Sequence, residues 1–338
     1  MTRPVPEASG STKPELSIRA TRDVPPAEWD ARVQAMRGNA FHGTGWAGVL
    51  ESNGQERWFL EFLAGNSPAG FAVAGGRRSR LPLVGARRSE LELNTTPLLR
   101  GDVDLTDAAR ALRAFARGQR FGWLQCSAYA SLRPSATETL GTLGFTVAPR
   151  VEFPLALANT FDATLAAMSS AHRRNVRKAM EEGFQFREDS TPDGAMTLRR
   201  LQDNTYARRW EMGQTHARPM SEEQYRQTME AWLRAEGIRF WFVERDGRPL
   251  SALGILIYGS RAYYLVGGTA TEGYEVRAPF AAFGNVIREL SAAGVSELHL
   301  GGVPAGAAEE THPDHGLYRF KRGFGAEPVT VWDARSRV

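Results

Sequence analysis

An internal repeat is the feature that most constrains the fold of this chain of 338 residues. The segment WFLEFLAGNSPAGFAVA (58–74) parallels WFVERDGRPLSALGILI (241–257), and each predicts a strand, a polar turn and a second strand. Both halves continue with a helical segment, a glycine and a short strand, and both end in Gly-Phe followed by an extended run. The tryptophans of the two segments are 183 residues apart, and the Gly-Phe pairs are 179 apart. A period this long, with five elements in the same order, indicates a duplicated domain.

The repeat predicts an α/β (α+β) fold with two tandem domains, each a mixed sheet flanked by helices. We place a disordered, Pro-rich lead-in at residues 1–14, the first domain at 15–152 and the second at 153–338. A helix-rich stretch at 160–236 has no counterpart of that length in the first half, so we expect it to be an insertion in the second domain.

The composition argues against a membrane protein, a secreted protein and a protein held together by disulfides or by cysteine-bound zinc. Hydrophobic residues make up 42% of the chain and charged residues 24%, as in a globular protein, and no apolar run reaches the roughly 18 residues of a membrane helix. The N-terminus lacks the apolar core of a secretory signal. Cys126 is the only cysteine, which excludes an internal disulfide and a cysteine-based zinc cluster. We therefore expect a cytoplasmic protein with no integral membrane segment.

The positive charge is clustered, although the formal net charge is only +4. Basic residues gather at 77–88, 172–178, 199–200, 208–209 and 319–322. In HRRNVRKAMEEG, helical spacing places four cations on one arc opposite apolar side chains, and Gly183 ends the helix. The four cations are Arg173, Arg174, Arg177 and Lys178. Such clustering indicates an anionic partner, nucleic acid or phosphate, or else a solvated face with side-chain stems lying over apolar surface.

The segment HGLYRFKRGFGA (315–326) combines aromatic, cationic and glycine residues. Gly323 and Gly325 flank Phe324 and suit a sharp passage from helix to strand. Two interpretations are open at this point. The segment is an ordinary C-terminal helix with surface lysine and arginines, or it places the cation of Lys321 at a reacting carbonyl or phosphate.

Known catalytic and metal motifs are missing from the sequence. There is no HExxH, Walker A or GxSxG pattern. His312-Pro-Asp-His315 has two histidines three apart, but Pro313 argues against a helix that presents both imidazoles on one face. We expect a loop there and no metal site. Cys126 falls in a predicted buried strand, WLQCS, and is expected to be a core residue and not a nucleophile.

With these motifs in view, the sequence resembles the Fem-type (FemABX) aminoacyltransferases. The resemblance spans roughly residues 16–333, and its strongest segments are AHRRNVRKAMEEG, the block from YYLVGGT to SELHLGG (263–302) and HGLYRFKRGFGAEPV. NAFHGTGWAGVLESNG (39–54) is similar to the family's N-terminal signature. The resemblance implies two tandem domains of the GCN5-related N-acyltransferase (GNAT) type. It also implies transfer of an amino acid from aminoacyl-tRNA to a peptide amine, with no other cofactor.

The resemblance assigns expected roles to single residues. Lys321, in FKRGF, corresponds to a lysine implicated in catalysis near the acyl ester. Residues expected to contact the acceptor are Trp46, Arg218, Tyr263 and Tyr264. Residues expected on a tRNA-binding surface are Arg173, Arg174, Arg177, Lys178, Arg319 and Arg322. We expect the chain to act as a monomer.

Two departures from the family pattern leave the acceptor open. Gly48 and Leu50 stand where members that use a nucleotide-linked precursor have a lysine after the tryptophan, and Ser127-Ala128 replaces a frequent Asp-Pro. The acceptor is then either a peptidoglycan precursor or another peptidyl amine, including one on an antibiotic pathway. No general base is evident.

Two alternative functions remain. An acyl-CoA-dependent N-acyltransferase on the same fold usually carries an R/Q-x-x-G-x-G/A loop, and the nearest stretch here starts at Gln119, fails at Leu124 and lies in the first half. A non-catalytic RNA-binding protein would explain the basic clusters, but it would leave Lys321 and the aromatic residues without a role.

Overall fold

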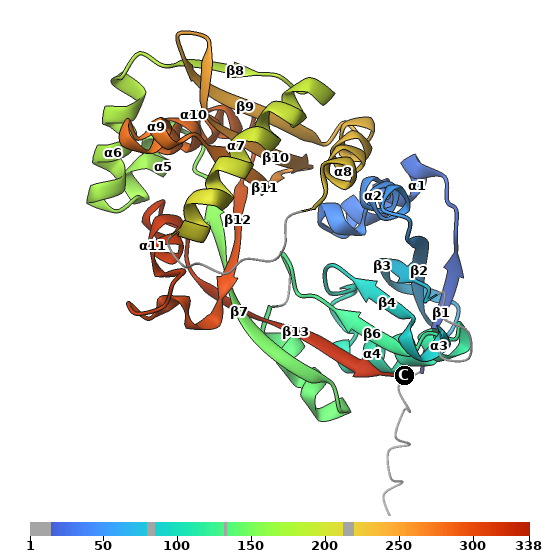
Figure 1. Ribbon diagram of the computed structural model, residues 1–338. Helices are drawn as coiled ribbons and strands as arrows, with labels where there is room; N and C mark the ends of the chain where they lie inside the picture. Colours follow the sequence, from blue (N-terminus) through green and yellow to red (C-terminus); the bar gives the residue numbers. More distant parts are fainter. Residues whose placement is uncertain (1–14, 80–84, 132–133, 212–219) are drawn as a thin grey trace, which may run out of the picture.

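The computed structural model describes residues 15–79, 85–131, 134–211 and 220–338 (Figure 1). The expected disordered lead-in at 1–14 and the expected acceptor residue Arg218 therefore lie outside the described residues. Two lobes, one from each half of the chain, are joined by long strands that cross between them (Figure 1).

The first half contains two edge helices, a hairpin, a central helix and short parallel strands. Its elements are β1 Leu16–Thr21, α1 Pro26–Ala35, η1 Ala40–His42, α2 Thr44–Ser52, β2 Glu56–Ala64, β3 Ser67–Arg77, α3 Gly85–Arg88, β4 Glu90–Leu93, β5 Leu98–Leu99, α4 Leu105–Gly118, β6 Trp123–Cys126, η2 Pro134–Leu143 and β7 Thr146–Ala156. The Asp104 side chain caps α4 by accepting from the Thr106 N–H. Gly65, at a positive φ of 62°, forms the tight turn between β2 and β3.

The second half begins with the helix-rich stretch and then repeats the pattern. Its elements are α5 Phe161–Ala167, α6 Ser170–Glu181, β8 Gln185–Glu188, α7 Pro192–Glu211, α8 Glu222–Arg234, β9 Ile238–Arg245, β10 Arg248–Tyr258, β11 Arg261–Thr269, α9 Thr271–Glu275, α10 Ala278–Ala292, β12 Glu297–Pro304, η3 Ala305–Ala308, α11 His315–Gly323 and β13 Val329–Arg337. The described part of the stretch at 160–236 contains the helices α5 to α8 and the short strand β8, which adds an edge strand to β9.

The repeat predicted from the sequence is present in the structure. The hairpin β2–β3 corresponds to β9–β10, and both pairs are antiparallel. The helix α4 and strand β6 correspond to α10 and β12, and in each half the strand after the helix pairs in parallel with an earlier strand. The tandem mixed α/β fold expected from the sequence is therefore confirmed.

The last strands of the two halves are exchanged. The sheet order runs β6-β13-β7-β12, so that β13 at the C-terminus lies between two strands of the first half, and β7 reaches across to β12 of the second. The predicted mixed sheets are thus joined into one continuous sheet within the described residues. The predicted boundary between residues 152 and 153 falls inside β7, and the domain limits stay a prediction.

The exchange of strands also determines which residues make up each apolar core. Phe153 of β7 is fully buried among residues of the second half, together with Val286 of α10. Ala334 of β13 is buried in the first-half core, together with Leu112 of α4. Each core therefore includes a strand from the other half of the sequence.

Candidate active site

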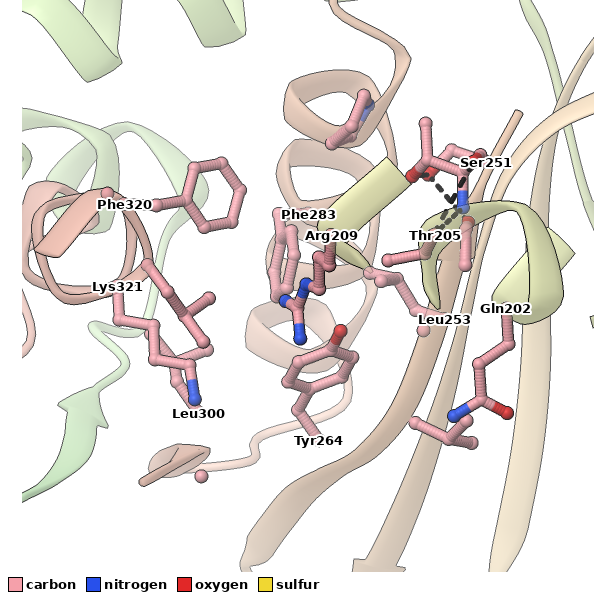
Figure 2. Close-up of a pocket in the computed structure, with 18 of the residues that line it drawn as sticks. Gln202, Thr205, Arg209, Ser251, Leu253, Tyr264, Phe283, Leu300, Phe320 and Lys321 are labelled. Carbon is pink, nitrogen blue, oxygen red and sulfur yellow. Dashed lines mark hydrogen bonds between the residues drawn. The ribbon is translucent and has the colours of Figure 1, made fainter. Parts of the chain in front are cut away.

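A cavity opens where two parallel strands separate. β11 and β12 pair over three positions, and their last register pair is Tyr263 with His299. An irregularity in β12 then follows, in which Gly301 takes a left-handed φ of 76°. The cavity beyond this point has a volume of about 720 Å³, and β11, β12, α7, α10 and α11 contribute to its wall (Figure 2).

The cavity wall is cationic on one part and aromatic on another. Its cationic residues are Arg208, Arg209, Arg277 and Lys321, and its phenylalanines are Phe280, Phe283, Phe320 and Phe324. Among the described residues that line it, none is an aspartate or a glutamate. Positive charge without a counter-charge favours an anionic ligand, and the rings offer an apolar or stacking surface beside it.

Lys321 is buried at this cavity, with only 7% of its surface exposed. Its Nζ donates a hydrogen bond to the carbonyl oxygen of Gly302 at 3.0 Å. Burial, with a further contribution from the nearby guanidinium of Arg209, lowers the pKa of Lys321 to about 7. In Figure 2, Arg209 and Tyr264 lie across the cavity from Lys321. Of the two interpretations of this segment, the structure excludes the one in which Lys321 is a surface lysine.

The placement of Lys321 depends on close packing of α11 against α6. His172 at the start of α6 lies against Gly323, where a Cβ atom would come within 2.0 Å of the imidazole ring. The ring nitrogen Nε2 is 3.0 Å from the Phe320 carbonyl oxygen. Gly323 is the last residue of α11, so it stands where the chain leaves the helix, and its lack of a side chain also admits the His172 ring. Gly325, with φ at 92°, takes the left-handed conformation in the passage that follows.

The two adjacent tyrosines of β11 point to opposite faces of the sheet. Tyr264 lines the cavity, and burial raises its pKa to about 12. Gly267 accommodates this ring, since a Cβ atom there would lie 2.3 Å from the Tyr264 hydroxyl. Tyr263 is fully buried and packs against Phe41, so it does not line the cavity.

Trp46, another expected acceptor residue, does not line this cavity. Trp46 of α2 stacks on Trp232 of α8, with ring centroids 5.9 Å apart, where the two lobes meet. Arg218 lies outside the described residues. The acceptor roles of Trp46, Arg218, Tyr263 and Tyr264 stay predictions.

The arc of cations on α6 is present, with one difference. Val176 and Ala179 are buried, as the helical pattern predicts. Arg173 is oriented back along the chain, and its guanidinium donates to the carbonyl oxygen of Ala166 at the end of α5. The other cations of the arc, Arg174, Arg177 and Lys178, and the arginines of α11, Arg319 and Arg322, keep their positions on the two helices. A role for any of these residues in tRNA binding stays a prediction.

The histidine pair and the cysteine have local structural contacts. His312 Nδ1 accepts from the Asp314 N–H, and His315 Nδ1 lies 3.1 Å from the Ala307 carbonyl oxygen. The described residues contain no cluster of ligands for a metal ion. Cys126 is buried, and burial raises the pKa of its thiol to about 12. It is a core residue, as expected.

Three arginines of the cavity are not identified by the sequence. In the sequence, Arg208 and Arg209 are recognisable only as a basic pair, and no sequence pattern indicates that Arg209 faces Lys321. Arg277 precedes α10 in a left-handed conformation, with φ at 61°. A non-glycine residue in that conformation is uncommon, and this unusual backbone at a helix entrance is visible only in the structure.

Comparisons with known proteins agree with this fold. Residues 167–322 match the family described as the acetyltransferase (GNAT) domain. The structure of FemX is similar over 94% of this chain and 96% of that chain, with 14% identity and a TM-score of 0.74. No curated protein sequence matches. None of the helices in the described ranges has the length and hydropathy needed to cross a lipid bilayer.

Two further structures have the same arrangement. A tandem GNAT protein from the clavulanic acid biosynthesis pathway is 13% identical over 96% of this chain and 98% of that chain, with a TM-score of 0.53. The C-terminal DUF2156 domain of a putative lysylphosphatidylglycerol synthetase from Agrobacterium fabrum is 16% identical over 92% of each chain, with a TM-score of 0.55. Residues 167–322 thus match a GNAT domain, and the whole chain has the fold of FemX and of a tandem GNAT protein.

Proposed function

We propose that the chain transfers an amino acid from aminoacyl-tRNA to the amine of a peptide-like acceptor, either a peptidoglycan precursor or a peptidyl natural product. The observation that supports this most is the buried Lys321 in a cavity whose other charges are arginines. The 3′ end of an aminoacyl-tRNA carries phosphates, a base and a reactive ester. The cavity offers cations and aromatic rings next to an amine for such a ligand.

The chemistry requires no covalent intermediate, because the aminoacyl ester is already activated. The acceptor nitrogen attacks the ester carbonyl carbon, and the carbon–oxygen bond to the terminal ribose breaks. The ammonium of Lys321 donates a proton to the leaving oxygen, and the resulting neutral amine takes the proton that the attacking nitrogen loses. A pKa of about 7 suits a group that must do both near neutral pH.

Positioning supplies the remaining catalysis. Arg209 and Arg277 line the cavity and would hold phosphate oxygens of the donor, and Phe320 and Phe283 would offer faces for the base or the amino-acid side chain. The cations of α6 and α11 outside the cavity would contact the tRNA backbone farther from the ester. Holding the donor at several points converts binding energy into alignment of the ester with the acceptor amine.

An acyl-CoA-dependent N-acyltransferase is the second candidate. The observation that favours it is Arg277 at the start of α10, because a cation at that point would also suit the diphosphate of coenzyme A. A non-catalytic RNA-binding protein is less well supported, since a lysine buried beside a cavity serves no purpose in binding RNA at a surface.

A donor competition experiment tests the proposal. Purified protein is incubated with acceptor peptides and a mixed aminoacyl-tRNA pool or acetyl-CoA, and loss of each donor is followed with and without acceptor. We expect acceptor-dependent loss of aminoacyl-tRNA that Lys321→Met slows about 10²–10³-fold. Consumption of acetyl-CoA alone would establish the second candidate, and binding of tRNA without turnover of either donor would establish the third.

A further inference from the structure

A buried chain of hydrogen bonds leads from the exchanged strand β7 to Lys321. Glu152 of β7 is only 2% exposed. Its Oε1 lies 2.7 Å from Nη2 of Arg150, and its Oε2 accepts from the Ala130 N–H and lies 3.0 Å from Nε2 of His299. A carboxylate is costly to bury and is retained here with several partners. Neither the repeat nor the mechanism above uses it.

His299 connects this carboxylate to the irregularity in β12. Its Nδ1 accepts from the Gly301 N–H at 3.2 Å, which leaves Nε2 as the ring nitrogen that donates to Glu152. His299 is also the last residue of β12 that pairs with β11. The imidazole therefore stabilises the backbone turn at the point where the two strands begin to diverge and the cavity opens.

The turn sets the position of the lysine. After Gly301, the carbonyl oxygen of Gly302 accepts the hydrogen bond from Lys321 Nζ. Gly302 is also the register partner of Glu152 across β12 and β7. The carboxylate, the imidazole and the backbone turn thus form a continuous support for the amine, and the first half of the sequence contributes the carboxylate.

We propose that Glu152 and His299 are a positioning pair that holds Lys321 at the cavity, with the carboxylate of Glu152 as the negative charge that acts on its amine. The proposal rests on the catalytic role of Lys321 given above, and it adds two residues with a stated function. Neither needs to touch the substrate.

The charges around Lys321 shift its pKa in known directions. Burial and the positive charges of Arg209 on α7 and Arg150 on β7 lower the pKa of Lys321, whereas Glu152 and Asp314, which precedes α11, raise it. Tyr264 and Tyr129 also line the cavity, and burial keeps both hydroxyls protonated by raising their pKa values. Removing the charge of Glu152 must therefore lower the pKa of Lys321 further.

The chain offers a direct measurement, because it contains only three lysines, Lys13, Lys178 and Lys321. Labelled lysine side chains give three NMR signals, and Lys321→Met identifies one of them. Glu152→Gln keeps the shape and a hydrogen-bonding oxygen while it removes the charge. Glu244→Gln is the matched control, because Glu244 is also buried and is paired with Arg187 at 2.9 Å, at the far edge of the sheet.

We expect Glu152→Gln to move the titration midpoint of Lys321 down by about one pH unit. The decline of kcat at high pH should move down with it, and kcat at pH 7 should fall about 10–100-fold while KM for the donor changes little. His299→Asn retains an oxygen for the Gly301 N–H but no longer reaches Glu152, and should lower kcat without breaking the fold. Glu244→Gln should change none of these values.

Several outcomes overturn the proposal. An unchanged Lys321 midpoint in Glu152→Gln does so, and so does a loss of kcat whose pH dependence is the same as in the wild type. If Glu152→Gln fails to fold, an unchanged midpoint and kcat in His299→Asn would be decisive. A lowered midpoint in a protein that transfers no amino acid would contradict the proposed function and leave the positioning of Lys321 standing.

Discussion

At the scale of single residues, Lys321 distinguishes a catalytic interpretation from a structural one. If its ammonium stabilises the leaving oxygen, Lys321→Ala and Lys321→Met should reduce single-turnover transfer about 10²–10³-fold, the cost of losing one preorganised donor. Lys321→Arg should not restore activity, because the planar guanidinium is wider than the buried amine and places its donors elsewhere. Binding of tRNA should persist in all three variants. Near-wild-type transfer by Lys321→Ala would remove this residue from the mechanism.

The same residue makes a prediction about stability. The pKa of Lys321 is about 7 in the folded protein against an ordinary 10.5, so the unfolded chain binds more protons between these values and stability rises with pH across this window. Lys321→Met removes the cost of the buried charge and should stabilise the protein by a few kcal/mol at or below pH 7. The gain should shrink toward zero as pH approaches 10.5. Urea unfolding at several pH values measures it, with Lys178→Met on α6 as control.

The sequence pointed to Lys321 as a candidate residue but could not predict its surroundings. The pattern FKRGF identified Lys321 through a family resemblance. Its burial depends on Gly302 and Arg209, which are distant in sequence, and a linear pattern carries no information about such neighbours. Tyr263 and Tyr264 show the same limit, because alternation along a strand says that they face opposite sides but not which side faces the cavity.

At the scale of elements, the helix α6 carries two kinds of cation: one that makes a structural hydrogen bond and others that are available to bind a ligand. Arg174→Glu with Arg177→Glu should weaken tRNA binding and reduce the slope of log affinity against log salt by about two, since two phosphates would no longer be neutralised. Arg173→Glu should mainly lower thermal stability, because this guanidinium holds the end of α5. Filter binding over a salt series, with melting curves, tests both. An unchanged slope in the double variant would argue against α6 as a tRNA surface.

The close packing of α6 and α11 gives a second prediction at this scale. Gly323→Ala should destabilise the protein by about 1–3 kcal/mol, because the added methyl group collides with the His172 ring. His172→Ala in the same chain should recover part of that loss, and a double-mutant cycle measures the coupling. Additive effects of the two substitutions would show that the close approach is not what requires a glycine.

At the scale of the whole molecule, the sequence predicted the duplication but not the exchange of strands. Five repeated elements in one order were enough to predict tandem α/β domains. The exchange could not be predicted, because β7 and β13 are equivalent members of the repeat, and their local sequences do not state which half supplies the partner strand. Long-range pairing decides it, through burial of Phe153 in one core and Ala334 in the other.

The exchange of strands predicts which parts of the molecule a C-terminal truncation would destabilise. Deleting residues 329–338 removes β13 from beside β6. We expect hydrogen exchange to accelerate in β6 and α4, which lie in the first half of the sequence, because the first-half core loses a covering strand. Amide exchange read by mass spectrometry, for the truncated and full chains, tests this. Faster exchange confined to the second half would contradict the strand order.

The crossing strands also have a mechanical consequence. β7 and β13 run antiparallel between the lobes and are paired from Val329 to Arg335, so they form a two-stranded connection that is hydrogen-bonded along its length (Figure 1). Rotation of one lobe against the other would have to bend these two strands and break their pairing with β6 and β12. A single-chain linker between the lobes would not resist rotation in this way. Hinge motion between the lobes would therefore cost free energy. Entry of a substrate into the cavity must come from local displacements of side chains and helix ends around a frame that keeps its shape.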